Sequence, residues 1–114
     1  MNFTEINEGA GTITFDVEVV LTGFFVMDGQ DGYFVESDAR VREKNRAVLV
    51  RHDDLKRKLL SSVPAFGGGE YLYGDRAEIT GVLSKSSDGR FLCEITDIKD
   101  FLIYKHGQAM PVRL

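Results

Sequence analysis

The sequence has only one cysteine, Cys93, among its 114 residues. A single thiol excludes an internal disulfide and cannot by itself supply a cysteine-based metal site. Cys93 alternates with Phe91 and Ile95, which is the spacing of side chains that share one face of a strand. A position in the core is therefore favoured over a reactive thiol.

Long apolar runs are also missing, and no stretch is long enough to cross a bilayer. The chain does not start with a basic segment followed by an apolar one, so we expect a cytoplasmic protein without a membrane partner. An apolar fraction of 43% is ample for a core. The length predicts a single domain over 1–114, with 1–11 and 105–114 as flexible termini.

Several motifs of enzyme chemistry are absent. The sequence contains no P-loop, no dinucleotide fingerprint, no Gly-x-Ser-x-Gly and no His-x-x-x-His. The glycine-rich segment 66–69 is not followed by Lys-Ser or Lys-Thr, so it is interpreted as a connector. His52-Asp53-Asp54 is interpreted as a helix start and not as a metal cluster. We therefore expect no catalytic residue, no metal and no cofactor.

Positive charge is missing from the first third of the chain. Residues 1–39 hold no Lys or Arg and carry a balance of -8, whereas residues 40–58 carry +5, within a net charge of -4. Such a run is usually a solvated face. It is also consistent with one half of an electrostatic recognition surface.

The clearest pattern lies in residues 74–104, which indicate two long strands joined by a turn. Every second residue from Ala77 to Leu83 is apolar or glycine, the period of a strand with one buried face. Turn chemistry follows at 86–89. In the second strand the apolar spacing lengthens by one residue after Ile95, which predicts a β-bulge near Thr96-Asp97.

The other elements are assigned from periodicity and from turn residues. In chain order they are a strand from Thr12 to Met27 bent at Gly23, a strand over Tyr33–Ser37, a loop over Asp38–Asn45 with one helical turn as an alternative, a strand over Arg46–Arg51, and a short helix that is capped by Asp53 or Asp54 and ends at Ser61-Ser62. This order predicts an all-β fold with one short helix. It is the layout of a five-stranded OB-fold-like Greek-key barrel, with the helix between strands three and four.

Two segments also resemble a family. GDRAEITGVL at 74–83 followed by FLCEITDI at 91–98 resembles the last two strands of the bacterial tRNA-anticodon-type OB domains, over residues 74–104. The shared features are a Gly-Asp lead-in, alternating apolar residues and a small residue before the turn. The resemblance implies oligonucleotide binding or a derived protein-binding role, and it brings no catalytic residue.

OB folds that bind single strands use the face of strands two and three and the loops beside it. Candidate ligand-binding residues on this basis are Tyr33, Arg40, Arg42, Lys44, Arg46, Arg51, Asp28, Asp31, Lys85 and Arg90. The acidic residues among them and the negative net charge disfavour nucleic acid. The favoured hypothesis is a non-catalytic module that binds another protein, in an inhibitor, immunity-type or assembly role. Single-stranded nucleic acid, bound through strands two and three and the basic 40–58 segment, is the alternative.

Overall fold

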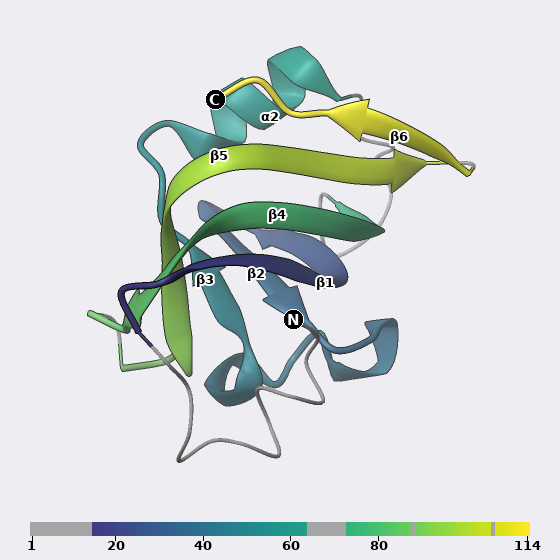
Figure 1. Ribbon diagram of the computed structural model, residues 1–114. Coiled ribbons are helices and arrows are strands. Elements are labelled where there is room, and N and C mark those ends of the chain that lie inside the picture. The colour runs from purple at the N-terminus through teal and green to yellow at the C-terminus, as the bar shows by residue number, and fades with distance from the viewer. Residues whose placement is uncertain (1–14, 64–72, 88, 106) are drawn as a thin grey trace.

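The computed structural model describes residues 15–63, 73–87, 89–105 and 107–114 of the chain (Figure 1). Its elements are β1 (Glu18–Asp28), β2 (Asp31–Val35), the 3₁₀ helices η1 (Asp38–Arg40) and η2 (Lys44–Arg46), β3 (Val48–Val50), α2 (Leu55–Ser62), β4 (Gly74–Lys85), β5 (Cys93–Lys105) and β6 (Gln108–Pro111). The expected strand start at Thr12 and the glycine-rich connector lie outside the described residues.

Five strands close into a barrel. The strand order is β3-β2-β1-β4-β5, and β3 also pairs in parallel with the first part of β5, with Val48 opposite Cys93. Figure 1 shows how β5 makes this possible, because it curves sharply from the side of β3 over to β4 and β6. The structure confirms an all-β, OB-like barrel with one helix between the third and fourth strands.

The core fills the barrel from strands on all sides. Its buried side chains include Leu21, Phe25, Phe34, Val48, Ile79, Ile95 and Phe101. Leu55 and Leu59 of α2 join them, four residues apart and so on one side of the helix. Every second residue from Ala77 to Leu83 is buried, which confirms the alternation read from the sequence.

The predicted bulge is present in β5. Thr80 pairs with Asp100 and Val82 with Thr96, so residues 97–99 of β5 oppose a single residue, Gly81. A Cβ at Gly81 would lie 2.7 Å from the carbonyl oxygen of Thr96. The strand therefore folds back over β4 so closely that only glycine fits beneath the bulge.

The strand ends and the helix cap differ from the sequence-based expectations. β2 starts two residues earlier than expected, and β3 is reduced to Val48–Val50. Asp54 stands at the N-cap of α2 but takes a left-handed φ of 57°, and its side chain makes no capping hydrogen bond. Its carboxylate instead accepts a hydrogen bond from Nη2 of Arg57 at 3.0 Å. The prediction of a carboxylate cap by Asp54 is therefore wrong.

The tail holds a strand that the sequence did not indicate. β6 pairs antiparallel with the second half of β5, with Ile103 opposite Met110. The N–H of Arg113 then donates to Oγ of Ser62 at 2.9 Å, which joins the tail to the end of α2. The segment Gln108–Pro111 is short and its apolar residues do not alternate, so the sequence contained no sign of a strand there. It becomes a strand because it pairs with β5.

Candidate functional site

The outer face of β1, β2 and β3, where OB folds hold single strands, is covered by the chain itself. Its side chains form a second buried cluster of Val26, Tyr33, Val35, Ala47, Leu49 and Phe91, none more than 6% exposed. We call residues 36–47, which join β2 to β3 and contain η1 and η2, the covering segment. The hydroxyl of Tyr33 donates to the carbonyl of Val41 at 2.6 Å, which fixes this segment on the strand.

Tyr33 is therefore not the exposed stacking residue that the sequence predicts. Its side chain is fully buried, and its ring packs against that of Phe91 with centroids 5.4 Å apart. Stacking on a base requires an exposed ring, so the prediction for Tyr33 is wrong. The apolar run Ala47–Val50 was the available signal, because a run without alternation indicates a strand buried on both faces.

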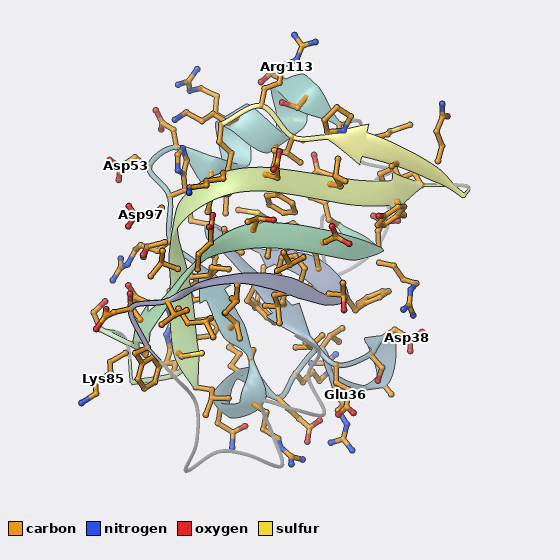
Figure 2. All side chains as sticks on the ribbon, viewed as in Figure 1. Glu36, Asp38, Asp53, Lys85, Asp97 and Arg113 are labelled. Atoms are coloured by element: carbon orange, nitrogen blue, oxygen red, sulfur yellow. The ribbon has the colours of Figure 1, made fainter. Side chains whose placement is uncertain are left out.

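Much of the predicted basic surface is neutralised by carboxylates. Ion pairs of 3.0–3.3 Å join Arg40 to Glu36 and Glu43, Lys44 to Asp28, Arg51 to Glu94, and Arg90 to Asp31. The structure thus brings Asp28, Asp31, Lys44 and Arg90 together around the turn between β1 and β2. Arg42, Arg46 and Lys85 are exposed, and Figure 2 shows Lys85 on the other side of the molecule from Glu36.

The acidic first third of the chain does not form a separate surface in its described part. Glu18 at the start of β1 pairs with Lys99 at 3.0 Å, whereas Asp28 and Asp31 pair with basic residues at the other end of that strand. Charges that are segregated in the sequence are mixed in space. For residues 15–39, which the structure describes, the interpretation as a separate acidic recognition surface therefore loses its geometric basis.

Arg51, whose side chain is half-exposed, takes part in a hydrogen-bonded network around the buried Glu94 at the start of β5. Glu94, 7% exposed, accepts hydrogen bonds from Nε of Arg51 at 3.1 Å and from the N–H and hydroxyl of Ser87 at 2.9 and 3.0 Å. Burial by itself would raise the pKa of Glu94, but these hydrogen bonds and the positive charge of Arg51 outweigh it and lower the pKa below 4.5. The guanidinium of Arg51 also bonds the hydroxyl of Ser87. The guanidinium of Arg51 is thus already bonded to Glu94 and Ser87 within the protein.

An open cleft of about 470 Å³ lies between the bulge of β5 and the segment that connects β3 to α2. We call it the bulge cleft, and it is lined by Arg51, His52, Asp53, Lys58, Thr96, Asp97 and Ile98. Nζ of Lys58 lies 2.9 Å from Nε2 of His52. Burial and the charge of Lys58 lower the pKa of His52, so the neutral ring accepts a hydrogen bond from the ammonium group.

The bulge cleft carries charges of both signs. Asp53 and Asp97 lie near each other at one edge of the molecule and point outward, on the side opposite Glu36 and Asp38 (Figure 2). Thr96, the hydroxyl-bearing residue of the lining, is 3.4 Å from the carbonyl of Val82, which accepts its proton. The cleft therefore offers both charge signs to a polar ligand, and Lys58 and His52 are hydrogen-bonded to each other in its lining.

A broad sheet surface lies on the outside of β1, β4, β5 and β6, facing the viewer in Figure 1. Because alternate residues of a strand point outward, the strand register places these side chains in rows across it. We call it the outer sheet face, with one row of Phe24, Arg76, Tyr104 and Ala109, a second of Thr22, Glu78, Leu102 and Pro111, and a third of Val20, Thr80 and Asp100.

This face mixes apolar and charged side chains. Val20 is 43% and Tyr104 37% exposed, and Phe24 and Leu102 are partly exposed beside them. Between these apolar groups, Arg76 and Glu78 stand two residues apart on the central strand, β4. The sequence did not single out this surface, because its members come from four strands and only the register brings them together.

Within the described ranges, no three His, Cys, Asp or Glu side chains come together as a set of metal ligands. No helix in the described part of the chain is long and apolar enough to span a membrane.

Comparison with protein-family models, with curated proteins and with solved structures finds no match for this chain.

Proposed function

We propose that this protein is a non-catalytic binding module that binds another protein through the outer sheet face. The observation that carries the proposal is a set of exposed or partly exposed apolar side chains on that face, Leu102 and Tyr104 side by side on β5 and Val20 on β1. Adjacent apolar groups of this kind, surrounded by polar ones, are typical of protein interaction sites. A tyrosine supplies contact area at little entropic cost, and aromatic residues are enriched at interfaces.

The state of the usual OB ligand face also supports a protein partner. The buried cluster beneath the covering segment leaves no exposed aromatic ring on β2 or β3, among the residues described there. The cations Arg40 and Lys44 on the covering segment are already engaged by carboxylates. A nucleic acid would have to displace both the segment and its ion pairs, whereas a protein partner on the outer sheet face would displace only water.

Site-specific photo-crosslinking tests the proposal. A benzoylphenylalanine in place of Tyr104 should crosslink to a protein in the cells that make this chain, because that position is exposed on the outer sheet face beside Leu102. The same group in place of the exposed Lys85, which lies outside the face, is the matched control. Equal crosslinking from both positions, or none from position 104, would contradict the proposal.

Single-stranded nucleic acid is the alternative ligand, and the exposed Arg42 and Arg46 on the covering segment are the observation that favours it. Anisotropy of labelled single-stranded DNA and RNA at low and physiological salt separates the two proposals. Nucleic-acid binding would weaken steeply with salt, would be abolished by Arg46→Glu and would survive Asp28→Ala. We expect no such binding even at low salt.

A further inference from the structure

We propose that the partner is a second copy of this chain, bound face to face through the outer sheet face about a two-fold axis. This inference rests on the proposed function, because it names the protein that the face binds. A two-fold interface joins the same surface on both copies, so each contact between residues i and j occurs twice. A surface suits such an interface when its own halves complement each other, and the outer sheet face has this property.

The complementarity follows from the register of β4. An axis that runs across the strands level with Ala77 places the row of Arg76 on one copy against the row of Glu78 on the other. Arg76 then faces Glu78 of the second copy, and the reciprocal pair forms on the other side of the axis. Both side chains project from the same face of the same strand, two residues apart, so rotation about the axis exchanges their rows and opposes unlike charges.

The neighbouring strands match about the same axis. Leu102 on β5 lies in the row of Glu78, and Tyr104 lies in the row of Arg76. The axis therefore sets Tyr104 of each copy against Leu102 of the other. On β1 it sets Phe24 against Thr22 of the second copy. Both of these pairs join an aromatic ring to an aliphatic or methyl-bearing side chain, and no like charges are opposed in the two rows.

Arg76 and Glu78 are the two charged residues of this face that the proposed interface uses. Among the described residues, neither Arg76 nor Glu78 forms a hydrogen bond or ion pair through its side chain. On neighbouring positions the charges are paired inside the monomer, as in Lys105 with Asp75 at 2.8 Å and Lys99 with Glu18 at 3.0 Å. Arg76 and Glu78 are therefore available to an intermolecular pair.

Sheet twist limits the size of the interface. Packed sheets cross at about 30°, so rows stay opposed only close to the axis, where the rows of Arg76 and Glu78 lie. A contact of two rows buries less than the roughly 800 Å² per partner of a stable complex. We therefore expect a reversible dimer whose population rises with concentration, and whose affinity falls with salt because exposed ion pairs are screened.

Charge reversal tests the pairing. In sedimentation velocity between about 10 μM and 1 mM, wild type should shift from monomer to dimer. Arg76→Glu places two carboxylates in contact and Glu78→Arg two cations, so each should weaken dimerisation at least about tenfold, the loss that 1.4 kcal/mol produces. The double variant Arg76→Glu/Glu78→Arg restores opposite charges and should return to within about threefold of wild type. Lys85→Glu, outside the face, should dimerise like wild type.

The outcomes separate this inference from the proposed function. Wild type that stays monomeric at 1 mM overturns the inference, as does a dimer that neither single reversal weakens or that the double reversal fails to restore. If the monomer still crosslinks from position 104 to a different protein, the proposed function stands and the second copy is excluded. If the protein neither dimerises nor crosslinks to another protein from position 104, the inference and the proposed function both fail. Circular dichroism on each variant shows that a loss of dimer is not a loss of fold.

Discussion

The contribution of a single residue to stability depends on its hydrogen-bond partners, and Glu94 is the clearest case in this barrel. It is a carboxylate in a mostly buried position, where an unpaired charge would be costly. Hydrogen bonds from Ser87 and Arg51 satisfy it and connect the segment between β4 and β5 to the end of β3. The pKa of Glu94 is lowered because the hydrogen bonds from Ser87 and Arg51 and the positive charge of Arg51 together outweigh the effect of burial.

Glu94→Gln should destabilise the fold by about 1–3 kcal/mol at pH 7, because the network loses its negative charge and one of its two acceptor oxygens becomes an NH₂ donor. The folded state holds the pKa of Glu94 below that of a glutamate in the unfolded chain, so the wild-type contribution is complete above the unfolded pKa. It is lost as the pH falls through the lowered folded pKa. Urea denaturation at pH 7 and pH 3 should show wild type losing more stability than the variant.

The matched control for this change is Glu36→Gln, which removes a carboxylate from an exposed ion pair with Arg40. Such pairs contribute about 0–1 kcal/mol. If both variants lost the same stability, the network around Glu94 would have no special energetic role.

Tyr33 is a neutral polar group that likewise depends on a hydrogen-bond partner in the fold. Tyr33→Phe removes the hydrogen bond to the carbonyl of Val41 and keeps the ring in its cluster. We expect a loss of about 1 kcal/mol in thermal or urea denaturation. Faster hydrogen exchange in residues 36–47 should accompany it, because the covering segment loses its attachment. Tyr104→Phe, on an exposed ring, should change stability by less than about 0.5 kcal/mol.

At the scale of elements, the bulge of β5 determines how the barrel closes. It inserts residues 97–99 against Gly81, and Asp97 takes a left-handed φ of 49° there, which Asp tolerates better than most residues. The strand can then turn from β3 toward β4 and β6. The same bulge forms one wall of the bulge cleft.

Gly81→Ala should destabilise the protein by about 1–3 kcal/mol. The new Cβ would meet the carbonyl oxygen of Thr96 at 2.7 Å and Cγ1 of Ile95 at 3.0 Å, and the backbone oxygen cannot move without disturbing the bulge. Gly89→Ala is the control, since a Cβ there meets nothing within 4 Å. Equal urea midpoints for the two variants would refute the close approach at Gly81.

β6 is an edge strand that is protected against pairing with other chains. By the alternation of an antiparallel ladder, Ala109, Pro111 and Arg113 direct their backbone groups away from β5. Pro111 has no N–H to donate, and the N–H of Arg113 is bonded to Ser62. Native proteins protect edges in this way, so association through a face is favoured over extension of the sheet.

At the scale of the whole molecule, the barrel is held closed where β5 meets β3. Cys93 lies at this junction, opposite Val48 of β3 and Lys85 of β4. It is fully buried, and burial, with a smaller effect of the charge on Glu94, raises the pKa of its thiol to about 11. A thiolate is the reactive form of cysteine. Reagents therefore react slowly with Cys93 for two reasons: its sulfur is buried, and its thiol stays protonated at neutral pH.

Cys93 should therefore report global opening of the barrel. At pH 7 without denaturant, we expect a colorimetric disulfide reagent to react far more slowly with the protein than with a peptide of residues 91–96. The rate should rise in urea in step with the loss of circular dichroism, because opening exposes the seam between β3 and β5. Complete reaction within seconds in native buffer would show that the junction opens locally.

The sequence alone was sufficient for the fold class, because the relevant signals are local. Alternation in β4, the shifted spacing after Ile95 and the two leucines of α2 each follow from backbone geometry and side-chain period. Strand ends were less well defined, since β2 and β3 are bounded by pairing partners. β6 had no local signal, because its partner β5 is what makes it a strand.

The functional surfaces were decided by the tertiary structure. Charge counted along the chain predicted an acidic and a basic surface, but folding set Asp28 beside Lys44 and Asp31 beside Arg90. Aromatic composition could not reveal that Tyr33 would be covered by residues 36–47. Pattern along one strand tells which side chains share a face, whereas closure of the barrel and the register between strands decide which faces stay open and which charges meet.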